Sequence, residues 1–171
     1  MTELSISVLI PAFNCADSLA KCIQSISEQT VDPLEIIVID DGSTDDTAIV
    51  AEQFEAARVV RRAEQGGAGA ARASGARVAK GDVLAFIDSD CIAPPDWIRN
   101  IGAEFGKNPN LGGVGGMYRH CHTKSLISIF GKFEEEFIHY NFAKTPHQST
   151  LTGGNVAFLR SVWNEARSGR E

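Results

Sequence analysis

The sequence predicts an α/β fold with a mostly parallel sheet and helices on both of its faces. Two apolar runs, residues 36–39 and 83–87, are short, favour β-structure and end in acidic residues. A third short run, residues 6–10, precedes them, and stretches with helical periodicity separate the runs. Strands and helices that alternate at this spacing are typical of βαβ units, whose parallel strands are buried on both faces.

The first strand is expected over residues 6–10, and we expect Pro11 to stop it. A polar turn at residues 14–17 leads into a helix, where either Asp17 or Ser18 is suited to cap the N-terminus. The apolar residues of this helix recur at i, i+3, i+4 and i+7. This spacing predicts one buried face, made by Leu19, Cys22, Ile23 and Ile26.

The second strand is expected over residues 35–39, and it also ends in carboxylates, Asp40 and Asp41. Turn residues then cap a helix over residues 46–55, and residues 59–60 are expected as a short third strand. Because parallel strands end at one edge of the sheet, the acidic residues after different strands should share a cleft.

A glycine-rich stretch at residues 65–75 continues into an alanine-rich run, which predicts a loop entering a tightly packed helix. The N–H groups at a helix start favour phosphate, and Arg72 adds a positive charge one turn later. The stretch lacks the Gly-Lys-Ser/Thr of a Walker A loop and does not follow the first strand, as a dinucleotide fingerprint would. Close packing and phosphate binding are both open at this point.

Two carboxylates, Asp88 and Asp90, directly follow the buried strand at residues 83–87. In an extended chain, residues two apart point the same way, so both side chains can converge on one ligand. Neighbouring carboxylates repel each other unless a cation or a proton lies between them. Mg²⁺ is typically held by one or two carboxylates and substrate phosphates. The pair therefore indicates a metal that carries a phosphorylated ligand, against the alternative of a solvated turn.

After this pair, the prolines at 94–95 are expected to open a helix with a buried stripe of Trp97, Ile98, Ile101 and Phe105. Residues 112–117 are a candidate strand, and residues 126–140 predict a long amphipathic helix. Residues 152–158 are expected as a loop that turns into a short apolar segment. Ser161 is expected to cap a closing helix.

The composition of the chain argues against nucleic-acid-binding and membrane-spanning proteins. A net charge of −6 argues against a nucleic-acid partner, and no apolar run approaches the length of a membrane-spanning helix. We expect one domain over residues 1–171 in a cytoplasmic protein with no leader, whose cysteines are reduced thiols: Cys15, Cys22, Cys91 and Cys121. The block His120 to His122 does not predict zinc, because no second cluster with ligand spacing accompanies it.

Taken together, five segments resemble the family 2 glycosyltransferases, which have the GT-A fold, a Rossmann-like architecture of nucleotide-diphospho-sugar transferases. In chain order they are residues 7–14, 37–45, 69–72, 81–90 and 153–155. The resemblance implies a nucleotide-sugar donor, with UDP as the expected nucleotide. It also implies transfer of the sugar, with inversion, to a hydroxyl of a sugar, lipid or polysaccharide acceptor. A lipid acceptor would bring the protein to the inner face of the membrane, and a homodimer is one option.

The resemblance also implies roles for residues at the nucleotide. Pro11 and Phe13 match the segment that lies against the base. Asp41 matches the carboxylate that binds the base, with Asp40 beside it, and Arg72 matches a basic residue near the nucleotide.

Asp88 and Asp90 match the family's Asp-x-Asp motif. The match implies Asp90 as the direct ligand of Mn²⁺ or Mg²⁺, and Asp88 as a residue that faces the ribose or a metal-bound water. Gly153, Gly154 and Asn155 match the loop near the donor sugar and the acceptor.

The family's catalytic base is an acidic residue in a Glu-Asp motif that follows the Gly-Gly-Asn loop. Only Glu165 and Glu171 follow Asn155 here, and neither stands in such a pair. We therefore expect the base beyond Glu171. The expectation is a complete nucleotide half at residues 1–92, an incomplete acceptor half at residues 93–171, and donor binding with little transfer.

Three alternatives differ in class. A nucleotide-sugar binding fragment without transfer activity is consistent with the missing base. A nucleotidyltransferase would normally carry a glycine-rich basic loop directly after its first strand, where this chain has residues 11–14. A receiver domain would also place an acidic pair after an early strand, but it would be shorter and would lack the second pair.

Overall fold

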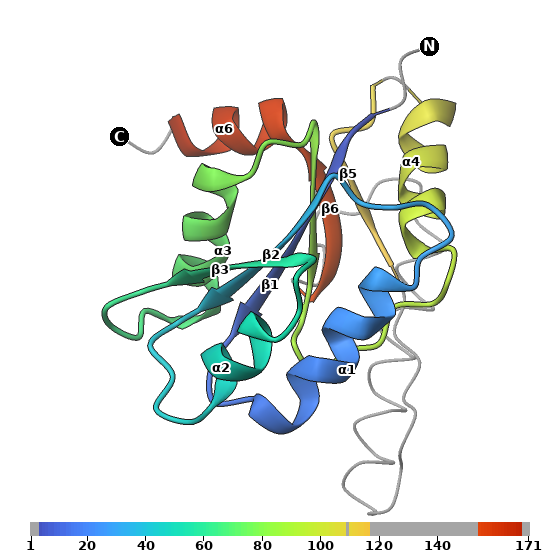
Figure 1. Ribbon diagram of the computed structural model, residues 1–171. Coiled ribbons are helices and arrows are strands. Elements are labelled where there is room, and N and C mark those ends of the chain that lie inside the picture. Colours follow the sequence, from blue (N-terminus) through green and yellow to red (C-terminus); the bar gives the residue numbers. More distant parts are fainter. Residues whose placement is uncertain (1–3, 109, 117–153, 169–171) are drawn as a thin grey trace, which may run out of the picture.

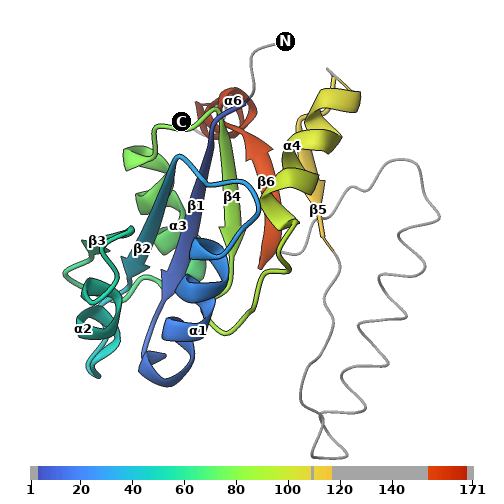
Figure 2. The ribbon, with the colours of Figure 1, turned by 45° about the vertical axis from the view of Figure 1, so that its right-hand side comes forward.

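The computed structural model describes residues 4–108, 110–116 and 154–168, and this part of the chain is organised around a six-stranded sheet (Figure 1). The strand order is β3-β2-β1-β4-β6-β5, and Figure 2 shows β2, β1, β4 and β6 side by side in that order. The strands are β1 (Ile6–Ala12), β2 (Glu35–Asp40), β3 (Ala57–Arg61), β4 (Val83–Ile87), β5 (Gly113–Gly115) and β6 (Asn155–Leu159).

The first four strands are parallel to one another, whereas β6 pairs antiparallel with both β4 and β5. The helices are α1 (Ala16–Ser27), α2 (Thr47–Glu52), α3 (Gly67–Val78), α4 (Trp97–Lys107) and α6 (Arg160–Ser168). The predicted α/β class, with a mostly parallel sheet and helices on both faces, is therefore confirmed.

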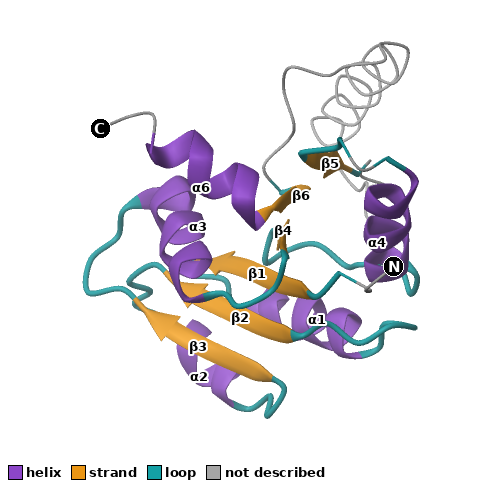
Figure 3. Ribbon diagram, turned by 90° about the horizontal axis from the view of Figure 1, so that it is seen from above, coloured by secondary structure: helices purple, strands orange, loops and turns teal. Residues whose placement is uncertain are grey.

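Two apolar layers sandwich the sheet because its central strands place alternate side chains on opposite faces. In β1, Ile6, Val8 and Ile10 join the layer that includes α1 and α4, whereas Leu9 joins the layer that includes α3. Figure 3 shows α1 and α2 on one side of the sheet and α3 and α6 on the other. Every residue of β4 is buried, as expected for a strand covered on both faces.

Pro11 does not stop the first strand, because β1 continues to Ala12 and pairs Pro11 with Ile39 of β2. The pairing of β1 with β4 ends earlier, at Leu9 and Phe86. Beyond that point β1 has a strand on one side only. A residue without an N–H is tolerated at such a place in a sheet.

The expected cap of the first helix was also wrong. Cys15, rather than Asp17 or Ser18, is the N-cap of α1. Its N–H donates to Thr47 Oγ1 at 2.8 Å, and the following N–H donates to Asp45 Oδ2 at 3.2 Å. The cap therefore comes from the loop after β2 and the first residue of α2, about thirty residues away in sequence.

Other helix starts differ from the expectation in a similar way. α4 begins at Trp97 with Asp96 as its N-cap, two residues after the prolines, although its buried stripe is the predicted one. α6 begins at Arg160 directly after β6, so Ser161 lies inside the helix. α2 is shorter than expected and ends at Glu52.

Several expectations fall outside the described residues: the helix at 126–140, the block at 120–122 and Gly153. Among the helices that are described, none combines the length and apolar character needed to cross a membrane.

Candidate functional site

A cleft of about 460 Å³ opens where β1, β2 and β4 end. Such a place, outside the carboxyl ends of parallel strands, is where open α/β sheets bind ligands. The lining comes from the ends of these strands and from the start of α3: Pro11, Ala12, Phe13, Cys15, Asp41, Gln65, Gly67, Ala68, Ala71, Arg72, Asp88, Ser89 and Asp90. Asp41 after β2 and the pair Asp88 and Asp90 after β4 thus share one cleft, as the sequence predicts.

Phe13 gives the cleft an aromatic wall, because the residue is 40% exposed and is one of the lining residues. The next residue, Asn14, has a positive φ of 47°. Its N–H donates to Ser43 Oγ at 3.0 Å, and its Oδ1 accepts the N–H of Thr44 at 2.8 Å. The loops after β1 and β2 are therefore joined, and this fixes Phe13 relative to Asp41.

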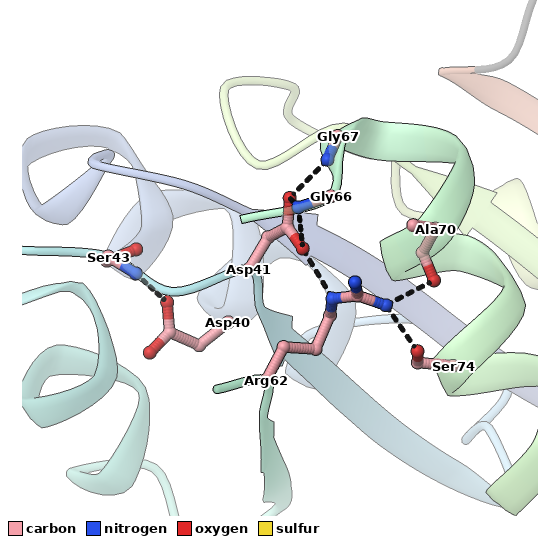
Figure 4. A network of polar contacts seen from close by, with 8 residues as sticks. All are labelled: Asp40, Asp41, Ser43, Arg62, Gly66, Gly67, Ala70 and Ser74. Carbon is pink, nitrogen blue, oxygen red and sulfur yellow. Dashed lines mark hydrogen bonds and ion pairs between the residues drawn. The ribbon is translucent and has the colours of Figure 1, made fainter. Parts of the chain in front are cut away.

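Asp41 is only 2% exposed and connects the end of β2 to the start of α3 (Figure 4). Its Oδ2 accepts the N–H groups of Gly66, at 3.0 Å, and Gly67, at 2.7 Å. Arg62 Nε lies 2.6 Å from Asp41 Oδ1, in an ion pair whose N–H is not aligned for a hydrogen bond. A carboxylate at a helix start is also favoured by the helix dipole.

Asp40 does not line the cleft with its neighbour. It is buried, and its Oδ1 accepts the N–H of Ser43 at 2.9 Å (Figure 4). This contact closes the turn after β2, which is the ordinary role of aspartate in a turn.

At the other end of the cleft, Asp88 and Asp90 both line the wall, but not through an extended chain. β4 ends at Ile87, and the N–H of Cys91 donates to Asp88 O at 3.0 Å, which closes a turn. Both residues thus line the cleft, but a turn places them there instead of the alternation of a strand.

Arg72, on the second turn of α3, lies opposite this acidic turn. Its Nη2 donates to Asp88 Oδ1 at 2.7 Å. Its Nε is buried and has no hydrogen-bond partner in the part of the chain that the structure describes. The ion pair therefore brings one arginine to the carboxylate end of the cleft while part of its donor capacity is unused.

The end of the Gly-Gly-Asn segment lies beside Asp88. The N–H of Asp88 donates to Gly154 O at 3.1 Å, and Trp97 Nε1 donates to Asn155 Oδ1 at 2.9 Å. Sequence reasoning assigned Trp97 only to the buried stripe of α4. The indole N–H was the available clue, because a buried tryptophan usually finds a hydrogen-bond partner.

Two thiols lie behind the acidic turn. Cys22 Sγ donates to Asp88 O at 3.5 Å, and burial is the main cause of its strongly raised pKa. Burial, followed by the charges of Asp90 and Asp88, raises the pKa of Cys91 to about 12. Cys15, Cys22 and Cys91 are all free thiols, which agrees with the expectation for these three.

No group of three or more His, Cys, Asp or Glu side chains among the described residues is arranged to hold a metal ion. A cation at this acidic turn would instead need oxygens from a ligand. That donor set, two carboxylates and phosphate oxygens, is the one that hard divalent cations take. The residues present therefore fit a cation that enters with a phosphorylated molecule.

The strand order and the position of the cleft define an α/β protein with its ligand site at the strand ends. The chain belongs to the glycosyl transferase family 2, whose model matches residues 7–166. It is similar to the glycosyltransferase GlyG of Streptococcus pneumoniae, with 37% identity over 105 residues, or 59% of this chain and 35% of GlyG. It is also similar to the chondroitin synthase of Pasteurella multocida, with 38% identity over 135 residues, or 77% of this chain and 14% of the synthase.

Solved structures share the fold. The mannosyltransferase PcManGT of Pyrobaculum calidifontis, in complex with GDP-Man and Mn²⁺, has a TM-score of 0.77 at 22% identity, over 97% of this chain and 47% of that one. Glucosyl-3-phosphoglycerate synthase of Mycobacterium tuberculosis, in complex with Mn²⁺ and UDP-glucose, has a TM-score of 0.66 at 29% identity, over 92% and 57%. The expected GT-A fold is confirmed. The chain spans about a third of the length of the curated relatives GlyG and AglE.

Proposed function

We propose that this chain is the donor-binding part of a glycosyltransferase that takes a sugar from a nucleoside diphosphate, with UDP as the expected nucleotide. One observation carries the proposal. A single cleft is lined by the exposed Phe13 after β1 and the buried carboxylate of Asp41 after β2, and, beyond β1 in the strand order, by two carboxylates after β4 with Arg72 beside them. A nucleoside diphosphate has matching parts, a flat base with N–H donors and a charged diphosphate.

At the base end, Phe13 offers its ring as a stacking surface. Asp41 is the acceptor for an N–H of the base, and Pro11 completes the wall. A carboxylate has about four acceptor positions. Gly66, Gly67 and Arg62 occupy most of these positions and hold the side chain of Asp41 in place. The remaining position is the proposed acceptor for an N–H of the base.

At the diphosphate end, Asp90 is the proposed direct ligand of Mn²⁺ or Mg²⁺, and Asp88 the residue that faces the ribose or a metal-bound water. When it is bound, such a cation offsets the negative charge that develops on the leaving diphosphate. Arg72 adds a fixed positive charge beside the same groups. Several solved relatives carry Mn²⁺ and a nucleotide sugar, which supports a cation of this kind.

The acceptor would approach over Gly154 and Asn155, which lie next to Asp88. The proposed reaction is a single displacement with inversion at the anomeric carbon, and its general base remains unassigned. A sugar, lipid or polysaccharide hydroxyl is the acceptor class. A cytoplasmic location is part of the proposal.

A thermal-shift screen of UDP-, GDP- and ADP-sugars, each with and without Mn²⁺, tests the proposal. A ligand at 100 times its Kd stabilises a protein by about 2.7 kcal/mol, which produces a clear shift. We expect UDP-sugars with Mn²⁺ to give the largest shift. A nucleotidyltransferase would instead respond most to a nucleoside triphosphate, and the absence of any response to nucleotide sugars would overturn the proposal.

A further inference from the structure

Arg62, directly after β3, contacts Asp41 of the cleft and the helix α3, although it does not line the cleft itself. Its Nε lies 2.6 Å from Asp41 Oδ1. Its Nη1 donates to Ala70 O at 3.1 Å and to Ser74 Oγ at 2.8 Å, both on α3 (Figure 4). Arg72 lies between these two positions in the chain and reaches Asp88 Oδ1 at 2.7 Å.

The chemistry of the guanidinium makes this bridge rigid. Its donors lie in one plane at fixed spacing, so Asp41 cannot shift against α3 without breaking a contact of Arg62. Asp41 also holds the N–H groups of Gly66 and Gly67 at the start of the same helix. The carboxylate and the first turns of α3 are therefore joined by contacts of both Asp41 and Arg62.

Arg62 also neutralises the negative charge of Asp41. Asp41 is buried, and burial of a charged group is costly unless the group is paired and hydrogen-bonded. Arg62 supplies the counter-charge from outside the cleft. The part of the Asp41 carboxylate that lines the cleft then remains available to accept a hydrogen bond from the ligand.

We propose that Arg62 is a positioning residue that couples the base end of the cleft to the diphosphate end, and that it acts on the diphosphate through Arg72. This inference rests on the proposed function. A lysine at this position would carry the charge but would lack the planar fork that spans Asp41 and α3.

A double-mutant cycle tests the coupling. Arg62→Gln, Arg72→Gln and the double variant are titrated by calorimetry with UDP and with inorganic pyrophosphate, each in Mn²⁺. We expect Arg62→Gln to weaken both ligands, UDP by about tenfold, which is in the range of coupled neighbouring residues. In the Arg72→Gln background, Arg62→Gln should no longer weaken pyrophosphate binding. A purely structural role would weaken pyrophosphate equally in both backgrounds.

The neighbouring arginine provides a matched control. Arg61 forms an exposed pair with Glu52 at 3.0 Å, so Arg61→Gln makes the same charge change without touching the bridge. It should leave both affinities unchanged, and a loss equal to that of Arg62→Gln would overturn the coupling in favour of a net-charge effect.

Ser74→Ala tests the bridge if Arg62→Gln fails to fold by circular dichroism. It removes one α3 acceptor of Arg62 and leaves Asp41 untouched. A loss of pyrophosphate affinity that disappears in the Arg72→Gln background supports the coupling, and unchanged affinity overturns it. If the wild-type chain binds UDP but the effects of Arg62→Gln and Arg72→Gln on pyrophosphate affinity simply add, the proposed coupling is wrong and the proposed function stands. If it does not bind UDP, the proposed function fails first.

Discussion

Asp41 makes more contacts with its own chain than a residue that only binds a ligand would need. Its oxygens hold two N–H groups and an arginine of the chain, and its side chain is almost fully buried. The sequence indicated a carboxylate at the end of β2. It could not indicate this anchoring, because Arg62 and Gly67 come from segments more than twenty residues further along the chain.

We expect Asp41→Ala to weaken uridine binding more than pyrophosphate binding. The substitution removes the proposed acceptor for the base and leaves an N–H of the base unpaired, at a cost of about 1–3 kcal/mol. Pyrophosphate should lose less affinity, since only the anchoring of α3 affects it. Calorimetry with uridine and with inorganic pyrophosphate measures both. Glu52→Ala, which breaks an exposed pair, is the control. Equal losses for the two ligands would leave Asp41 as an anchor only.

Asp82 joins the starts of β1 and β4 at the opposite end of the sheet. Its Oδ2 accepts the hydroxyl of Ser5 at 2.7 Å and the N–H of Ser5 at 3.1 Å. These hydrogen bonds lower the pKa of Asp82 below 3.8, the ordinary value of an aspartate. A carboxyl whose pKa is lower in the folded state stabilises the fold above its unfolded pKa, and this stabilisation is lost as the pH falls through the folded value.

The variant Asp82→Asn should therefore be less stable than the wild type at neutral pH, and the difference should shrink as the pH falls below about 3.8. Urea denaturation at a series of pH values measures the free energy of unfolding of both proteins. A difference that stays constant from neutral pH down to pH values well below 3.8 would show that the charge of Asp82 contributes nothing.

At the scale of elements, the local pattern of apolar residues predicted which segments form strands and which helix faces are buried. It predicted less well where the strands and helices begin and end. The four buried residues of α1 and the four of α4 follow from apolar spacing, which is a local property. The acceptors that cap α1 are Asp45, in the loop after β2, and Thr47, at the start of α2. The continuation of β1 through Pro11 depends on where its neighbour β4 stops pairing. Both are set by tertiary contacts, which a local pattern does not contain.

The helix α3 packs close to the sheet because of one glycine. A Cβ at Gly75 would lie 2.6 Å from side-chain carbons of both Ile39 and Leu9, whereas a Cβ at Gly69 would meet nothing within 4 Å. This confirms that the glycine-rich stretch enters a tightly packed helix. It also explains how the backbone of α3 comes near enough to the strand ends to line the cleft.

These two glycines give opposite expectations for the same substitution. Gly69→Ala should stabilise the protein by about 0.5–1 kcal/mol, since alanine favours a helix and the site is open. Gly75→Ala should instead destabilise it, because overpacking a filled core costs about 1–3 kcal/mol, more than the gain in helix propensity. Urea denaturation of both variants measures the two changes. Stabilisation by Gly75→Ala would show that the sheet yields easily beneath α3.

At the scale of the whole molecule, the parallel sheet brings together residues that are far apart in sequence. Phe13, Asp41 and Asp90 follow β1, β2 and β4, Arg72 lies in α3, and all four residues line one cleft. The sequence predicted this convergence from the rule that parallel strands end at one edge. It could not predict that Asp40 would turn away from the cleft, or that Trp97 would hold Asn155, because both depend on side-chain contacts across the fold.

The central claim is that this cleft binds a nucleoside diphosphate together with a divalent cation at Asp90. Titration calorimetry of UDP against the wild type, Asp90→Asn and Asp32→Asn, each in Mn²⁺ and in EDTA, tests it most directly. Asp32 is an exposed acid in the loop before β2, at the other end of the sheet, and serves as the matched control. We predict that EDTA weakens UDP binding to the wild type by about tenfold or more, which corresponds to a loss of at least about 1.4 kcal/mol of binding free energy. Asp90→Asn should lose the response to Mn²⁺, and Asp32→Asn should keep it. Equal affinity for UDP in Mn²⁺ and EDTA, or a wild-type response to Mn²⁺ in Asp90→Asn, would contradict the claim.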